Sequence, residues 1–367
     1  MTGVGGGAGA PPVGRIPSLD GMRAVSIVLV LFSHLLGTRG FPVTATPLLD
    51  LGDLGVRIFF VLSGFLITGL LLKEWDRTAR IDLRAFYIRR TLRIFPAFYV
   101  YLAVLALAGP VSLRDGDLLR AATYTINYST THDWLVGHAW SLAVEEQFYL
   151  TWPLLLLWLT PARAPRAAVA AIVLAPVMRV LLMALPDGTI GLQAYVGASF
   201  ETMVDAIATG ALLALVRDRL WIWAPYRRLV GSGLALLLPV VGLAAGSLRW
   251  WGPWVSPRVE WVLSGLFAAV GLTLLNLCIA MIVDRVVRLH DGPLGRLLNQ
   301  RHVAFLGTLS YSVYIWQQLF LDRHTDAWYA RFPQNILFVL AAALLSYHLV
   351  EQPVLRWRDR LMRPART

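Results

Sequence analysis

The sequence predicts an all-α integral membrane protein: a polytopic bundle of about ten transmembrane helices with both the N- and C-termini in the cytoplasm. Three observations support this class, namely an apolar composition, apolar runs of about twenty residues, and basic residues concentrated in alternate loops. Of the 367 residues, 57% are hydrophobic and 15% are charged, whereas soluble domains have about 25% charged residues. The runs match a hydrocarbon core of about 30 Å, so we expect the lipid bilayer to surround the chain.

The apolar runs divide the chain into a short tail, a membrane domain and a second tail. The candidate spans lie near residues 19–37, 54–73, 92–109, 147–160, 167–185, 200–216, 229–247, 259–283, 303–321 and 335–353. Prolines interrupt the fourth and fifth spans, which makes their boundaries the hardest to place. Residues 1–17 are rich in glycine and proline and form a flexible tail, residues 18–355 form the transmembrane domain, and residues 356–367 form a basic cytoplasmic tail.

The distribution of basic residues sets the expected orientation. With a cytoplasmic N-terminus, the inside segments hold 24 Lys and Arg residues and the outside loops hold seven, as the positive-inside rule requires. The net charge of +11 is therefore mostly a topology signal, and we expect no nucleic-acid partner. A single cysteine, Cys278, excludes a disulfide framework, and no metal site is expected.

The first span carries three ionisable residues, Asp20, Arg23 and His34, and Arg23 and His34 are eleven residues apart. Eleven residues correspond to three helical turns plus about 20°, so both side chains share one face and lie roughly 16 Å apart along the axis. Ionisable groups inside spans often mark a functional site. The alternative is structural, with a snorkelling arginine and a histidine bonded to a neighbouring helix.

Two adjacent carboxylates, Glu145 and Glu146, open the fourth span at a depth similar to that of His34. Neighbours on a helix cannot face the same way, so we expect one carboxylate to point into the bundle. A histidine and a glutamate from different helices can form a base and its orienting acid. Alternatively, both glutamates are interfacial acids without a partner.

Arginines at the cytoplasmic edge of the third span form a second candidate site. Arg89 and Arg93 lie one turn apart, with Arg90 beside them. Guanidinium groups bind phosphate oxygens bidentately, which suits a phosphate-bearing ligand. Charge that only sets topology is the alternative. In the fifth span, Arg179 is expected to form a structural ion pair with Glu201 or Asp205. These two acids are four residues apart and share one helix face.

Six motifs in order resemble the membrane acyltransferase-3 family, which O-acetylates bacterial surface polysaccharides and some secondary metabolites. They are Leu19–Arg23 with His34, Gly55–Thr68, Phe86–Pro96, Trp140–Glu145 with Tyr149, Leu309–Trp316 and Tyr347–Pro353. Together they extend over residues 16–355, essentially the whole chain. Each motif alone is weak, and the ordered set is specific. Some family members have an acid where Arg57 stands, which leaves a role for Arg57 open.

The resemblance implies an acyl-CoA donor, usually acetyl-CoA, and a hydroxyl acceptor on a carbohydrate or glycosylated molecule. It implies that His34 is catalytic, with Arg23 and Glu145 assisting. It also implies that Arg89, Arg90 and Arg93 bind the donor. We further expect Ser63, Trp140 and Tyr149 to contact the substrate. Some members carry a hydrolase-like periplasmic domain after the last span, and we expect no such second step here.

These expectations combine into one mechanism in a bacterial inner membrane. Acyl-CoA docks from the cytoplasm on the arginines, and its pantetheine carries the thioester toward His34. His34 then either removes the acceptor proton or takes the acyl group covalently. A transporter or flippase that passes a polar or lipid-linked substrate is the alternative function. It would move substrate without consuming CoA.

Overall fold

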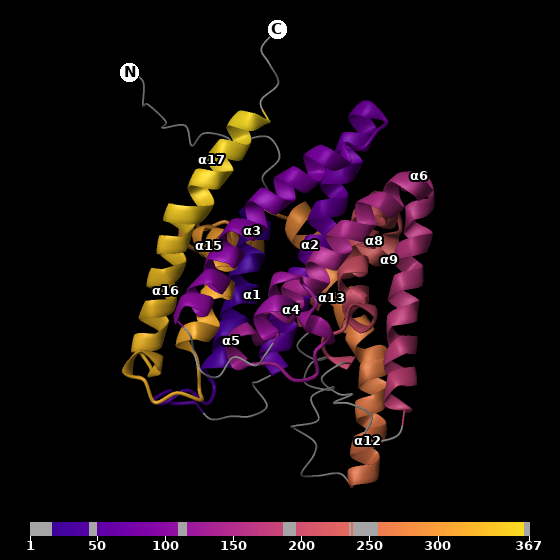
Figure 1. Ribbon diagram of the computed structural model, residues 1–367. Coiled ribbons are helices and arrows are strands. Elements are labelled where there is room, and N and C mark those ends of the chain that lie inside the picture. Colours follow the sequence, from indigo (N-terminus) through magenta and orange to yellow (C-terminus); the bar gives the residue numbers. More distant parts are fainter. Residues whose placement is uncertain are drawn as a thin grey trace, which may run out of the picture.

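Every regular element in the described part of the chain is a helix (Figure 1). A computed structural model describes residues 17–43, 50–108, 116–185, 196–234, 236–237 and 256–362. The all-α prediction is therefore confirmed. Residues 1–16 of the predicted N-terminal tail lie outside the described residues.

The longer helices carry most of the bundle. They are α1 (Pro17–Leu35), α2 (Asp50–Thr78), α3 (Leu83–Ala108), α6 (Ala139–Met183), α8 (Phe200–Ile222), α13 (Leu272–Arg288), α15 (Arg301–Phe320) and α16 (Gln334–Ser346). Shorter elements connect or extend them: α4 (Asp117–Ala122), η2 (Ile126–Tyr128), α5 (Trp134–Gly137), α9 (Ala224–Gly231), α12 (Pro257–Leu266), η4 (Phe267–Gly271), α14 (Pro293–Leu298), η5 (Trp328–Ala330), η6 (Tyr347–Glu351) and α17 (Gln352–Leu361).

Six segments of the described chain are long and apolar enough to cross a membrane. They are Pro17–Leu35, Leu51–Thr78, Leu83–Ala108, Trp134–Met183, Phe267–Arg288 and Gln334–Leu361. The chain is therefore a multi-pass membrane protein, while ten spans and the cytoplasmic placement of the termini stay predictions. Helices α8 and α15 occupy two further expected spans. The expected span at 229–247 lies mostly outside the described residues.

Two boundaries differ from the sequence expectation. Helix α6, which contains the fourth predicted span, begins at Ala139, eight residues before that span, because the helix includes the polar segment around Glu145. A residue with non-helical dihedral angles, Thr160 (φ 62°, ψ 160°), separates α6 into two helices, where the sequence places the fourth and fifth spans. Helix α17 continues to Leu361, so the predicted tail at 356–367 begins inside a helix.

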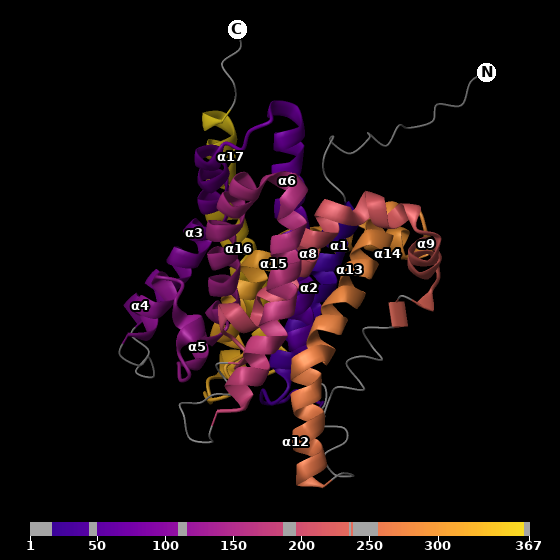
Figure 2. The ribbon, with the colours of Figure 1, turned by 90° about the vertical axis from the view of Figure 1, so that its right-hand side faces the viewer.

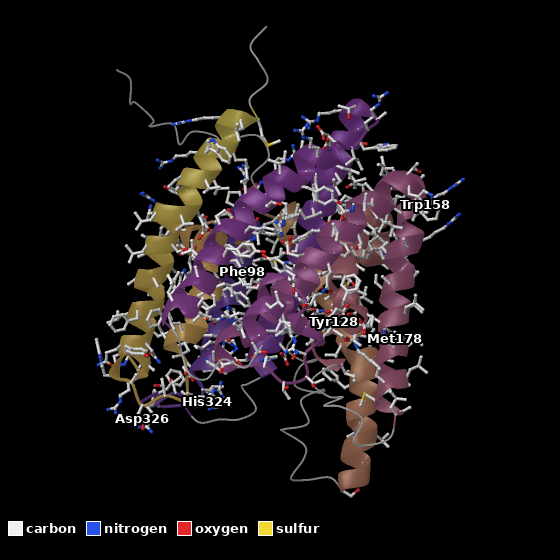
Figure 3. The ribbon with its side chains drawn as sticks, viewed as in Figure 1. Phe98, Tyr128, Trp158, Met178, His324 and Asp326 are labelled. Carbon is white, nitrogen blue, oxygen red and sulfur yellow. The ribbon has the colours of Figure 1, made fainter. Side chains whose placement is uncertain are left out.

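The bundle has two chemically different ends. At one end α17 finishes beside the connection between α2 and α3 (Figure 1). We call this the arginine end, because Arg89 lies near the start of α3 and Arg358 lies in α17. The opposite end carries His324 and Asp326 (Figure 3), and we call it the histidine end. From the side, α12 and α13 run in line along one flank of the bundle (Figure 2).

Helices α2 and α8 cross at two glycines. A Cβ built on Gly64 would lie 1.9 Å from the carbonyl oxygen of Ile207, and one on Gly210 would lie 1.9 Å from that of Val61. No side chain fits at such distances, so the two backbones touch directly. Small residues permit this close packing between membrane helices, and the crossing fixes the position of Ser63 on α2.

A fully buried ion pair joins α6 to α8. A guanidinium nitrogen of Arg179 lies 2.6 Å from the Asp205 carboxylate, and neither side chain is exposed. The remaining guanidinium hydrogens reach the Thr202 carbonyl at 2.7 Å and the Ala268 carbonyl at 3.2 Å. The predicted ion pair of Arg179 is confirmed with Asp205 as the partner. Arg57, which is also buried, donates to Asn276 at 3.2 Å.

Candidate active site

A cavity of about 610 Å³ enters the bundle from the arginine end between α1, α2, α3, α6, α8, α15 and α17. Seven basic side chains line it against four acidic ones. The basic residues are Arg23, Lys73, Arg89, Arg90, Arg93, Arg217 and Arg358, and the acidic ones are Asp20, Asp76, Glu145 and Asp218. Its wall therefore carries a net positive charge. All three arginines predicted to bind the donor lie in this wall, together with Arg23.

Most of these cations already have a carboxylate partner. Arg23 contacts Asp20 at 3.0 Å, Arg89 contacts Glu74 at 3.5 Å, Arg217 contacts Asp284 at 3.2 Å and Arg358 contacts Asp359 at 2.7 Å. Arg93 and Lys73 differ, because within the described ranges neither has a carboxylate within 4 Å. These two cations line the cavity with their charge uncompensated at close range.

The inner part of the cavity is built around Glu145. The Ser63 hydroxyl donates to Glu145 Oε1 at 2.6 Å, and the Arg90 guanidinium lies 3.9 Å from Glu145 and from Glu146. Arg90 also stacks 3.6 Å over the ring of Tyr149. Glu145 lines the cavity and Glu146 does not. The adjacent carboxylates thus separate as expected, although both still reach Arg90 because its side chain lies between them.

His34 lies toward the histidine end and is not among the residues that line the cavity. Its Nδ1 is 3.2 Å from Gln317 Oε1, and its ring packs edge-on against Trp134 with centroids 5.5 Å apart. The hydrogen bonds of His34 and Glu145 therefore go to different partners. The structure does not bring these two side chains together as a base and its orienting acid.

Helix α15 presents a polar face that the sequence analysis did not single out. Tyr314 lines the cavity, and its hydroxyl lies 2.6 Å from Ser141 Oγ and donates to the His138 carbonyl at 3.0 Å. Gln318 Oε1 lies 2.9 Å from His138 Nδ1. Gln317, beside it, contacts His34. Positions 314, 317 and 318 share a helix face, so polar residues at this spacing inside an apolar run were the available signal.

The three residues expected to contact substrate occupy different surroundings. Ser63 lines the cavity. Trp140 packs edge-on against Phe60 with centroids 6.0 Å apart, and Tyr149 is buried beneath Arg90. Neither aromatic residue is part of the cavity wall, so their roles in substrate binding stay predictions. No group of three or more potential metal ligands occurs within the described ranges.

Several curated proteins are similar to this chain. O-acetyltransferase OatA of Staphylococcus aureus strain NCTC 8325 is 26% identical over 368 residues, covering 92% of this chain and 57% of the relative. Peptidoglycan O-acetyltransferase OatA of Listeria monocytogenes is 27% identical over 380 residues, covering 92% and 56%. A putative O-acetyltransferase of S. aureus strain COL is 27% identical over 384 residues, covering 94% and 59%.

The chain thus spans less than three-fifths of the length of these relatives. No solved structure matches it at a significant level. A family model described as an acyltransferase domain matches residues 16–356, which include all six ordered motifs and every residue that lines the cavity except Arg358. This chain therefore belongs to the membrane acyltransferase-3 family.

Proposed function

We propose that this protein transfers an acyl group, most simply acetyl, from acyl-CoA to a hydroxyl group of a carbohydrate or glycosylated acceptor. The observation that carries the proposal is the cationic cavity at the arginine end, in which Arg93 and Lys73 have no close carboxylate among the residues that the structure describes. Phosphate groups of CoA are suitable anions for such a wall, because guanidinium and ammonium groups form charge-assisted hydrogen bonds with them. The O-acetyltransferase names of the relatives support the reaction class.

The proposed direction follows from the two ends. The arginine end faces the bacterial cytoplasm, where acyl-CoA is made, and the termini lie on that side of the inner membrane. The excess of basic residues in the predicted inside loops supports this orientation. His34 then lies toward the outer face, where a surface glycan is accessible. The name of the Listeria relative, a peptidoglycan O-acetyltransferase, supports a cell-surface carbohydrate as acceptor.

His34 is proposed to be the catalytic base. With Gln317 Oε1 as acceptor, the proton of the neutral imidazole is on Nδ1, and Nε2 keeps its lone pair. In direct transfer, Nε2 takes the hydroxyl proton while the hydroxyl oxygen forms a bond to the thioester carbonyl carbon. The carbon–sulfur bond breaks, and the CoA sulfur takes the proton from the imidazolium. An acyl-histidine intermediate is the other route, in which Nε2 itself attacks the carbonyl carbon and the carbon–sulfur bond breaks to release CoA as the thiolate. The acceptor hydroxyl oxygen then takes the acyl group from Nε2, and its proton goes to the thiolate.

Glu145 and Arg23 are proposed to assist from the cavity. The contacts of Glu145 with Ser63 and Arg90 indicate that it holds these two side chains at the inner part of the cavity. Arg23 shares a helix face with His34 and forms an ion pair with Asp20. We propose that Arg23 contacts the donor close to the cavity entrance. Both groups would then position the donor, while His34 acts on the reacting atoms.

Release of free CoA tests this function. Full-length protein in lipid nanodiscs is given acetyl-CoA with and without carbohydrate acceptors, and both free CoA and acylated sugar are measured. We expect acceptor-dependent release of CoA, which His34→Ala abolishes while the protein stays folded. His302→Ala is the matched control, because His302 is exposed and far from His34 on the chain. An active His34→Ala protein would refute the assignment, and substrate movement without CoA release would indicate a transporter.

A further inference from the structure

At the histidine end, one arginine lies close to His34 without an anionic partner. Arg323 follows α15, and its guanidinium stacks over the Trp134 ring at 4.7 Å. Its Nε is buried and makes no hydrogen bond, and within the described ranges Arg323 has no carboxylate within 4 Å. Burial lowers the pKa of Arg323, and the nearby Asp322 offsets part of this effect. This half-buried guanidinium thus packs against the Trp134 ring and lies beside Gly37.

Trp134 ties this cation to the catalytic region. Its indole Nε1 donates to the Gln318 carbonyl at 3.0 Å, which fixes the plane of the ring. One side of the ring meets His34, with centroids 5.5 Å apart, and His324 packs against it at 5.9 Å. Arg323 and His34 therefore contact the same rigid ring. A group bound to the Arg323 guanidinium would therefore lie near His34, beside the Trp134 ring that both residues contact.

Two other arginines at this end, Arg39 and Arg331, differ from Arg323. Arg39 forms an ion pair with Asp326, and Arg331 donates to the Asp326 carbonyl at 3.5 Å. Both are exposed, whereas Arg323 is partly buried. A cation costs free energy when it is removed from water without a compensating charge. A ligand that brings a negative charge would supply that compensation.

We propose that Arg323 and Trp134 form an acceptor subsite that binds an anionic group, a carboxylate or a phosphate, on the carbohydrate. The inference rests on the proposed function, since it takes the acceptor to approach His34 from this end. The guanidinium binds the two anionic oxygens, and the apolar indole lines the site beside the sugar. A sugar anchored in this way presents a hydroxyl to Nε2 of His34. The subsite selects acidic acceptors over neutral ones.

Binding of three matched sugars tests the subsite. The probes are N-acetylglucosamine, N-acetylmuramic acid, which adds a carboxylate, and N-acetylglucosamine 1-phosphate. Affinity is measured by saturation-transfer NMR on the full chain in nanodiscs, in a His34→Ala background so that turnover plays no part. We expect Arg323→Gln to weaken binding of one or both anionic sugars about 10-fold or more, the effect of losing a charged hydrogen bond. Binding of the neutral sugar should not change.

Arg39→Gln is the matched control, because it removes one positive charge from the same end and should leave all three affinities unchanged. The proposal is overturned if Arg323→Gln weakens the neutral sugar equally, if it has no effect on either anionic sugar, or if both arginine variants act alike. In the His34-containing enzyme, the change should appear in KM for the anionic acceptor. A fall in kcat with every acceptor would instead place Arg323 at the reacting atoms and also overturn the subsite.

Failure of the subsite and failure of the proposed function are distinguishable. Charge-selective binding that depends on Arg323, in a protein that releases no CoA, would retain the subsite and refute the acyl transfer. Acceptor-dependent CoA release that is indifferent to Arg323 would retain the transfer and refute the subsite.

Discussion

The two flanks of the bundle use arginine in different ways. On the flank made by α6, α8 and α13, Arg179 is completely buried, its charge is paired with Asp205, and it donates hydrogen bonds to two backbone carbonyls. Around the cavity, Arg93 has no close carboxylate and faces open space. A neutralised arginine holds helices together, whereas an arginine that lines a cavity without a counter-charge is available to a ligand. The partner of each guanidinium, rather than its depth, separates the two roles.

The largest expected effect is on stability and comes from breaking the buried Arg179–Asp205 pair. Asp205→Leu leaves Arg179 buried without its counter-charge, which should cost about 3–5 kcal/mol of stability. Arg179→Met should destabilise less than Asp205→Leu, because it leaves a carboxylate that Thr273 still contacts at 2.7 Å. The double variant should recover most of the loss, as measured by thermal unfolding in detergent. A double variant as unstable as Asp205→Leu would show that the pair itself is not the source.

The next effect concerns the contact between α15 and His34. Gln317→Leu removes the acceptor of His34 Nδ1 and lets the imidazole turn or change tautomer. Misplacement of a catalytic group by about 1 Å costs on the order of 100-fold in rate, so kcat should fall by that order. The melting temperature and KM for acyl-CoA should stay close to those of the parent. Gln334→Leu, at an exposed glutamine, is the control. Equal losses in both variants would contradict a positioning role.

A smaller effect compares two arginines of the cavity wall. Arg93→Gln removes a cation without a close carboxylate, and we expect KM for acyl-CoA to rise about 10-fold. Arg89→Gln removes a cation that is already paired with Glu74 at 3.5 Å, so the KM for acyl-CoA should rise less in this variant. Neither variant should change KM for the acceptor or the melting temperature. Initial rates over a range of both substrates provide the test, and equal effects on the two KM values would argue against donor binding.

The smallest effect is expected at the mouth of the cavity. Arg358 is bound to Asp359 on the same helix at 2.7 Å, and exposed pairs of this kind contribute about 0–1 kcal/mol. Arg358→Gln should therefore change KM for acyl-CoA by about fivefold at most. Asp359→Asn frees the guanidinium and should lower that KM slightly at low salt. A large rise in the KM for acyl-CoA in Arg358→Gln would show that an arginine with a carboxylate partner can still bind the donor.

Charged features of this architecture could be predicted from the sequence. Arg179 is the one charged residue in its apolar run, so burial requires an acidic partner, and the sequence leaves Glu201 and Asp205 as the two candidates. Arg89 and Arg93 lie one turn apart and do share the cavity. The helix of the fourth span begins earlier than the apolar pattern indicates because Glu145 and Glu146 interrupt that pattern, and Arg90 and Ser63, from two other helices, compensate the partly buried carboxylates.

The amide contacts could not be predicted in the same way. Gln317 and Gln318 carry no charge, so a hydropathy pattern marks them as polar positions in an apolar run but does not indicate their partners. Their partners, His34 and His138, are 283 and 180 positions away in the chain. Pairing at that separation depends on how α1, α6 and α15 pack. Sequence spacing reveals which residues share a helix face, but not which neighbouring helix that face meets.

The polar face of α15 has a consequence for the order of events in turnover. Tyr314 forms part of the cavity wall, and Gln317 touches His34 one turn further along the same rod. A ligand that displaces α15 at the cavity wall therefore also shifts the Gln317 amide that contacts the His34 imidazole. Coupling between the cavity and His34 then needs neither a mobile domain nor a hinge. Such a linkage favours compulsory order, with the donor loaded first and the acceptor engaged second.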